Sequence, residues 1–155
     1  MFIWKIQDHC RILLSLWFRI KRWRDILDKE QKKYKILLVD DDKVFLETMC
    51  NILRMEGFEV NDAETAESGF EAMVNIRPDL VMLDINLPDK SGFEVLTSIK
   101  NSKNFSEIPV VLITGDTAVL VDQAFEKGAD DCFFKPINPK EIIDRIKKIL
   151  EEYEN

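Results

Sequence analysis

Acidic, hydroxyl and amino side chains stand directly after four separate apolar runs of the sequence. Three aspartates follow one run, a fourth follows another, and a threonine and a lysine follow two more; the residues are Asp40, Asp41, Asp42, Asp84, Thr114 and Lys135. Carboxylates that converge repel one another unless a cation joins them, and oxygen ligands without His or Cys suit a hard ion such as Mg²⁺. With a hydroxyl and an ammonium beside it, such a set has the parts of a phosphoryl-transfer site.

The apolar runs predict the strands that must bring these side chains together. Short apolar runs at Lys35–Val39, Leu80–Leu83 and Ile108–Ile113 are typical of strands buried on both faces, and Phe58–Asn61 and Asp131–Phe134 are shorter candidates. Helical spacing of apolar residues predicts the helices Lys43–Met55, Ala66–Ile76, Ser91–Ile99, Ala118–Lys127 and Pro139–Glu152. This alternation indicates an α/β fold, a doubly wound parallel sheet, whose ligands bind beyond the carboxyl ends of the strands.

Local residue types predict how the helices begin. Thr65 and Asn138 are the expected N-caps of the second and the last helix, because their side chains can accept hydrogen bonds from unpaired helical N–H groups. Asp42 and Asp89 are expected to be solvated loop acids.

Composition bounds the classes of protein that the chain can belong to. Its 155 residues, 46% of them hydrophobic, are enough for one domain with a substantial core. No apolar run approaches the ~20 residues of a membrane span. Three distant cysteines (Cys10, Cys50 and Cys132) and one histidine exclude a disulfide framework and a His-based metal or triad site, and suit a reducing cytoplasm.

The charges divide the chain into two parts. Residues 1–34 carry nine Lys or Arg against four Asp or Glu, a net charge of +5, and all three Trp. Residues 35–155 carry 13 basic and 25 acidic residues, a net charge of −12. This change predicts a basic extension at 1–34 and a separate acidic domain at 35–155, which by itself should repel nucleic acid and anionic lipid.

Five stretches of the acidic part carry a family resemblance, in the family's order: KILLVDDD, DLVMLDINLP, PVVLITG, EKGADD and FFKPI. From about Lys35 to Tyr153 the chain resembles the receiver domain of two-component response regulators. The resemblance implies a flavodoxin-like (βα)5 fold with strand order 2-1-3-4-5. It also implies phosphorylation on an aspartate, by a partner sensor histidine kinase or a histidine phosphotransfer protein. Such a domain is a phosphoacceptor that assists its own phosphorylation and dephosphorylation, and is not an enzyme in the usual sense.

The resemblance assigns roles to the candidate residues one by one. Asp84 matches the phosphoacceptor, and Asp40 and Asp41 match the acidic pair that holds Mg²⁺, with Asp41 as the direct ligand. Asn86, two residues after the acceptor, would offer a backbone carbonyl to the metal. Thr114 matches the hydroxyl that follows the phosphoryl group when the domain switches.

Lys135 matches the lysine that pairs with the acceptor and the phosphoryl oxygens, and Lys135–Pro136 matches a bond that is typically cis in the family. The sequence departs from the family pattern three residues earlier, where Cys132 replaces the usual Tyr or Phe at a switch position. A buried, inert thiol is favoured there over a redox role. Asn86 and Asp116 would flank attacking water and so tune dephosphorylation.

The basic extension predicts an amphipathic helix over about residues 3–31, because apolar residues recur every seven positions at Ile6, Leu13, Ile20 and Leu27. Three interpretations remain open. The helix packs on the receiver or pairs with a second copy, giving a homodimer; it lies on the anionic inner face of the membrane as a peripheral contact; or it contacts nucleic acid or comes from a misplaced start.

The sequence shows no DNA-binding effector domain of the usual kind, so the expected output is an unknown downstream protein, self-association or the extension. Two functions therefore compete. The first is a phosphorylation-dependent switch or phosphorelay carrier in the cytoplasm. The second is an interaction module that acts through its N-terminal helix without phosphorylation.

Overall fold

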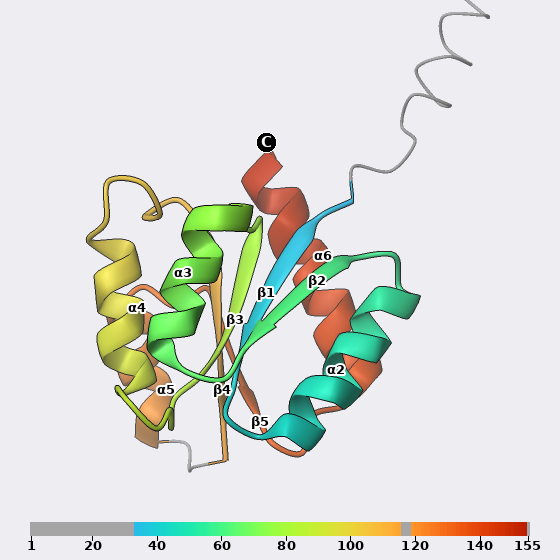
Figure 1. Ribbon diagram of the computed structural model, residues 1–155, viewed down its shortest axis with the longest axis horizontal. Helices are drawn as coiled ribbons and strands as arrows, with labels where there is room; N and C mark the ends of the chain where they lie inside the picture. The colour runs from blue at the N-terminus through green and yellow to red at the C-terminus, as the bar shows by residue number, and fades with distance from the viewer. Residues whose placement is uncertain (1–32, 116–118, 155) are drawn as a thin grey trace, which may run out of the picture. The chain divides into compact units, whose positions relative to one another are not determined.

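The structure is a computed structural model that describes residues 33–115 and 119–154. Residues from Lys33 onward form one compact unit (Figure 1). The predicted N-terminal helix lies outside the described residues, and the predicted domain boundary stays a prediction.

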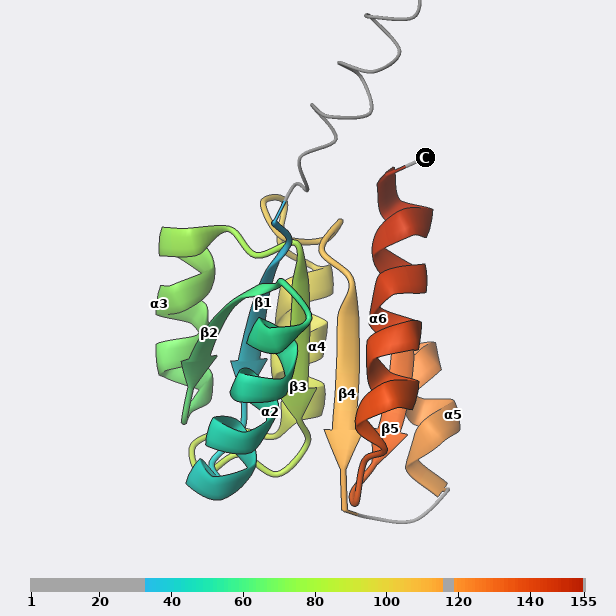
Figure 2. The same ribbon diagram turned by 90° about the vertical axis from the view of Figure 1, so that its right-hand side faces the viewer.

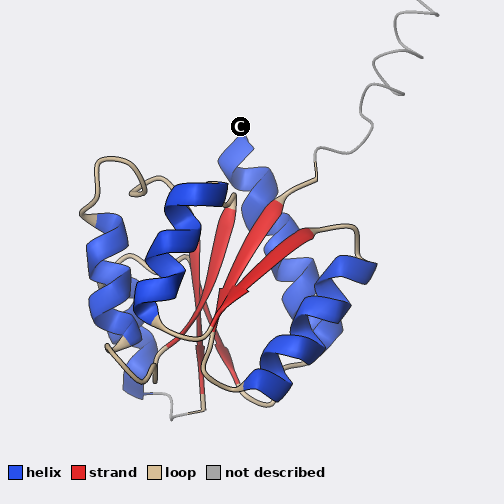
Figure 3. Cartoon of the chain, in the orientation of Figure 1, coloured by secondary structure: helices blue, strands red, loops and turns tan. Residues whose placement is uncertain are grey.

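Five strands alternate with five described helices along the chain. The strands are β1 (Lys35–Val39), β2 (Glu59–Ala63), β3 (Leu80–Asp84), β4 (Val110–Thr114) and β5 (Asp131–Phe134). The helices are α2 (Lys43–Met55), α3 (Ala66–Ile76), α4 (Gly92–Lys100), α5 (Val119–Glu126) and α6 (Pro139–Glu154). All strand pairs are parallel, in the order β2-β1-β3-β4-β5, which confirms the predicted fold class (Figure 3).

Helices cover both faces of the sheet, so the strands alternate between two cores. In β1, Ile36 and Leu38 pack with α2 and α6, whereas Leu37 and Val39 pack with α3, α4 and α5. Figure 2 shows α6 and α2 on one side of the sheet and α3 and α4 on the other. Burial on both faces explains why β1, β3 and β4 are almost wholly apolar.

The predicted bounds of the edge strand β2 differ from the observed ones by up to two residues. Phe58–Asn61 was the prediction, but β2 runs from Glu59 to Ala63, because all five of its residues pair in register with Lys35–Val39. Only Val60 and Ala63 of this edge strand are buried, so its apolar pattern is weak. The other predicted bounds agree with the observed ones within two residues.

Side-chain oxygens begin the helices as the residue types predict. Thr65 accepts a hydrogen bond from the Ser68 amide at the start of α3, and Asn138 accepts one from the Lys140 amide at the start of α6. No helix within 33–115 and 119–154 combines the length and apolar character that crossing a bilayer would take.

Candidate functional site

Three carboxylates meet at the carboxyl end of the sheet. Asp40 directly follows β1, Asp84 is the last residue of the neighbouring β3, and Asp41 follows Asp40. One oxygen from each lies within 4.8 Å of the others, as a shared metal ion requires. Asp40 and Asp84 are buried, with 0% and 3% of their surface exposed, whereas Asp41 is exposed. The three predicted metal-binding aspartates are therefore brought together.

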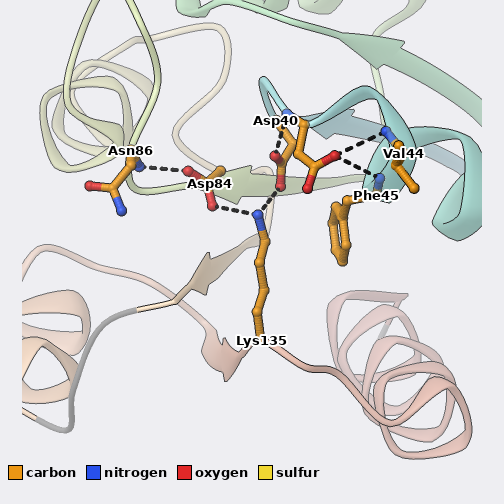
Figure 4. Close-up of polar contacts among 7 residues, drawn as sticks. Asp40, Val44, Phe45, Asp84, Asn86 and Lys135 are labelled. Carbon is orange, nitrogen blue, oxygen red and sulfur yellow. Dashed lines mark hydrogen bonds and ion pairs between the residues drawn. The ribbon is translucent and has the colours of Figure 1, made fainter.

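A lysine that follows the edge strand β5 contacts the two buried carboxylates. Lys135 follows β5, and its Nζ lies 2.7 Å from Asp40 Oδ2 and 3.0 Å from Asp84 Oδ1 (Figure 4). Burial raises the pKa of the Asp40 carboxyl, although its hydrogen bond with Lys135 acts in the opposite direction. Burial acts to lower the pKa of Lys135, but its hydrogen bonds to both aspartates outweigh burial and raise it. The ammonium therefore stays charged between them.

Backbone amides hold the other oxygen of each buried carboxylate. The Asp42 amide donates to Asp40 Oδ1 at 3.0 Å, and the Asn86 amide donates to Asp84 Oδ2 at 2.6 Å. Each carboxylate is thus fixed by Lys135 on one oxygen and by an amide two residues later on the other. Among the described residues, every buried polar side-chain atom has a hydrogen-bond partner. Both oxygens of Asp40 and both oxygens of Asp84 therefore have a partner.

The segment after Asp84 is pressed against the start of α4. The Gly92 amide donates to the Ile85 carbonyl at 2.8 Å, and Asn86 and Ser91 form a β-bridge. A Cβ at position 92 would lie 2.3 Å from the Asp84 carbonyl oxygen, which is too close for any side chain. Glycine at this position therefore allows α4 to begin directly behind the site.

Two aspartates that were predicted to be merely solvated have defined structural roles. Asp42 is exposed, but its Oδ1 accepts from the amides of Val44 and Phe45 and so caps α2. Asp89 is exposed too, yet its two oxygens accept from the amides of Ala66 and Glu67 at the start of α3. The hydrogen bond from Ala66 is the main cause that lowers the pKa of Asp89. Asp42 could have been recognised from its place before a helix, whereas nothing local in the sequence links Asp89 to α3.

The predicted switch residues lie on β4 and on β5, the edge strand that pairs with β4, or directly after it. Thr114 ends β4 and is fully buried, and its carbonyl accepts from the Lys135 amide at 2.8 Å. The Lys135–Pro136 bond is cis, as predicted. Cys132 is partly buried against the core formed with α3, α4 and α5, and burial raises the pKa of its thiol. This favours the unreactive thiol form. Asp116 lies outside the described residues.

Comparisons with known proteins agree with this geometry. The family model for the response regulator receiver domain matches residues 36–147. A CpxR homolog from Haemophilus influenzae, named a transcriptional regulatory protein, is 41% identical over 120 residues, covering 75% of this chain and 50% of that protein. The phosphate regulon regulator PhoB of Escherichia coli is 36% identical over 118 residues, covering 75% of this chain and 51% of that protein. The chain thus spans about half the length of the curated relatives it matches.

The crystal structure of a CheY-like receiver domain protein from Methanospirillum hungatei superposes with a TM-score of 0.74 at 33% identity. The match covers 79% of this chain and 98% of that one. The order of the strands, the acidic cluster and the family match all indicate a receiver domain. The chain belongs to the response regulator receiver domain family of two-component signal transduction.

Proposed function

We propose that Asp84 accepts a phosphoryl group from a sensor histidine kinase or a histidine phosphotransfer protein, in a Mg²⁺-dependent reaction that changes protein–protein contacts. The observation that carries the proposal is the Asp84 carboxylate, held between the Lys135 ammonium and two further carboxylates at the carboxyl end of the sheet. The family match supports it, because receiver domains interact with histidine kinases.

The donor set fits a magnesium ion. Three carboxylates and one ammonium leave a net charge of about −2 at the site, which a hard divalent cation would balance. Asp40, Asp41 and Asp84 would hold the ion, and the resemblance adds the backbone carbonyl of Asn86. A bound Mg²⁺ would supply neutralisation of the charge on the transferring phosphoryl oxygens.

The chain's own residues account for the remaining chemistry. An Asp84 oxygen attacks phosphorus as the bond from phosphorus to the donor nitrogen breaks, giving an acyl phosphate. Lys135 is already hydrogen-bonded to Asp84 and can pair with a phosphoryl oxygen without a large movement. In this way the domain assists its own phosphorylation and dephosphorylation.

The switch would pass through Thr114 and Lys135. The backbone hydrogen bond between them joins the end of β4 to the residue after β5, so a movement of one residue would move the other. New phosphoryl oxygens that accept from the Thr114 hydroxyl would favour one position of this pair over another. With Cys132 at the position usually held by an aromatic ring, the output would not depend on a ring changing its rotamer.

The output itself is also a proposal. The curated relatives are named as transcriptional or DNA-binding regulators, and the chain matches about half of their length. A downstream protein, a homodimer and a peripheral membrane contact through residues 1–34 all remain candidate outputs. A phosphorylation-independent interaction module is not favoured, because Asp40, Asp84 and Lys135 keep a complete and connected site.

Intact mass spectrometry tests the phosphoacceptor. The full chain, incubated with Mg²⁺ and acetyl phosphate, should gain the mass of one phosphoryl group, and chelation of the metal should abolish the gain. Asp84→Asn should remove the gain, whereas Asp144→Asn, which changes an exposed acid on α6, should not. A gain that persists in Asp84→Asn would contradict the assignment.

A second measurement asks whether the extension responds to the site. All three Trp lie in residues 1–34, so Trp emission reports on the extension while beryllofluoride with Mg²⁺ addresses Asp84. An emission change that is lost in Asp84→Asn would support the extension as an output element. An unchanged emission in a chain that takes up phosphoryl would contradict it.

A further inference from the structure

The Lys135 ammonium has an aromatic neighbour besides its two carboxylates. The centre of the Phe45 ring lies 4.5 Å from Nζ, well within the range of a cation–π contact. An ammonium carries three N–H groups, and Asp40 and Asp84 accept two of them, at 2.7 and 3.0 Å. Figure 4 shows the Phe45 ring on the side of the lysine away from Asp84. The ring therefore offers an electron-rich face to a part of the ammonium that the carboxylates leave uncovered.

The place of Phe45 in the fold makes its ring a fixed support. Phe45 belongs to the first turn of α2, and its amide donates to Asp42 Oδ1 at 3.1 Å. Asp42 in turn donates its amide to Asp40, so Phe45 and Asp40 are held by the same cap. The ring is partly buried and packs against the core between α2, α6 and the sheet. Its position relative to Asp40 is therefore set by the helix start and the core together.

Lys135 needs such a support more than a short side chain would. Its ammonium stands at the end of a flexible four-carbon stem, and about a quarter (26%) of the side chain is exposed. Rotamers that carry the ammonium into water compete with the one that bridges the aspartates. A ring beside the ammonium favours the bridging rotamer and keeps water from one side of the ion pair, where desolvation strengthens the attraction.

We propose that Phe45 is a positioning residue for phosphoryl transfer, whose ring face holds the Lys135 ammonium between Asp40 and Asp84. The inference rests on the proposed function, since it concerns the rate at which Asp84 is phosphorylated. Phe45 does not touch the phosphoryl group; it acts through Lys135. A purely structural role in the core would need only an apolar side chain of similar size, and this difference makes the inference testable.

The test compares Phe45→Leu, which keeps an apolar side chain without a ring, with Phe45→Tyr, which keeps the ring. Phe70→Leu is the matched control, because Phe70 is also a partly buried helical phenylalanine but lies on α3 in the other core. Three quantities are measured on the full chain: the phosphorylation rate with phosphoramidate at saturating Mg²⁺, the Mn²⁺ affinity by electron spin resonance, and the NMR shift of the Lys135 Hε protons.

We expect Phe45→Leu to lower the phosphorylation rate about 3- to 10-fold, the range that an exposed to partly desolvated cation–π contact gives. Its Mn²⁺ affinity should stay within about twofold, because the substitution leaves all three metal-binding carboxylates unchanged. The ring-current shift of the Lys135 Hε protons should disappear. Phe45→Tyr should keep the shift and more than half of the rate, and Phe70→Leu should keep both.

Two outcomes would overturn the inference. Phosphorylation of Phe45→Leu at the wild-type rate would show that the ring is not needed. A loss of rate that comes with an equal loss of Mn²⁺ affinity, or that Phe45→Tyr shares, would show that the substitution disturbs the start of α2 rather than Lys135. If the unchanged chain takes up no phosphoryl group, the proposed function itself fails; a phosphorylated chain that is indifferent to Phe45→Leu overturns the inference alone.

Discussion

An alanine at position 92 would test whether α4 must begin in direct contact with the end of β3. Its Cβ would lie 2.3 Å from the Asp84 carbonyl oxygen and 2.7 Å from Ile85 Cα. Both are backbone atoms and cannot rotate away. Because ordinary contacts begin near 3.4 Å, the helix start must move by about 1 Å relative to the strand. Overpacking of this kind costs about 1–3 kcal/mol.

The sign of the effect makes the prediction sharp. Without a clash, replacing glycine by alanine in a compatible conformation stabilises a protein by about 0.4–1 kcal/mol, because the unfolded chain loses freedom. The clash should reverse this, so we expect Gly92→Ala to lower the free energy of unfolding by about 1–2 kcal/mol. Because the displaced atoms belong to Asp84 and its neighbour, the phosphorylation rate should fall as well.

Urea unfolding of the full chain, followed by circular dichroism, measures the free energy of unfolding of the Gly92→Ala variant. Gly115→Ala is the matched control, because a Cβ there would meet no atom within 4 Å. The control should be as stable as the wild type or slightly more stable. A Gly92→Ala protein that equals the control in stability and in phosphorylation rate would refute the argument that this close approach is required.

Three further predictions concern residues around the sheet and the site. Arg145→Met should lower the free energy of unfolding by about 1–2 kcal/mol, because it removes the two hydrogen bonds, of 2.6 and 2.8 Å, that Arg145 donates to the buried Asp131 carboxylate and leaves that from the Cys132 amide; urea unfolding in which the variant matches the wild type would contradict this. The pKa of Asp89 is lowered in the fold, so its stabilising contribution is present above its ordinary value near 3.8 and is lost as the pH falls through the folded value. The stability gap between wild type and Asp89→Asn should therefore be larger at pH 7 than at pH 3, and an equal gap at both would argue against the cap. Asn86→Ala and Asp116→Ala should change the lifetime of the phosphorylated chain more than its rate of phosphorylation, as followed by intact mass; unchanged lifetimes in both would count against a tuning role.

The fold could be predicted largely from the sequence because burial on both faces leaves a plain pattern. Strands such as Leu80–Asp84 are apolar throughout, and the helices between them show apolar residues at helical spacing. The predicted bounds of the edge strand β2 differ from the observed ones by up to two residues, because pairing with β1 sets its extent more than its own composition does. Local pattern fails where a neighbour decides the bounds.

The central residues of the site could be predicted for a related reason. In a parallel sheet, a polar residue directly after a buried strand must reach the same edge as its counterparts, so Asp40, Asp84 and Lys135 were expected together and are found together. The contacts of Phe45 and Asp89 were not predicted, because their partners lie 90 and 22 to 23 residues away and the contacts depend on loop paths. A phenylalanine at helical spacing is otherwise indistinguishable from core.

The two sides of Asp84 differ in the kind of contact that holds them to the rest of the domain. On the side of α4, Asp89 caps α3, the Asn86–Ser91 bridge closes the loop, and Gly92 packs against the strand end. On the side of β4 and β5, Asp84 pairs in register with Ile113 of β4, and the Lys135 side chain reaches Asp84 from beyond β5. The Lys135 contacts and the Thr114–Lys135 backbone bond are the ones that we expect an acyl phosphate to rearrange. A charge added at Asp84 should thus leave the β3–α4 loop in place and act on the ends of β4 and β5. The contacts on the α4 side would hold the proposed nucleophile in place, and the Lys135 side is where we expect phosphorylation to change the conformation.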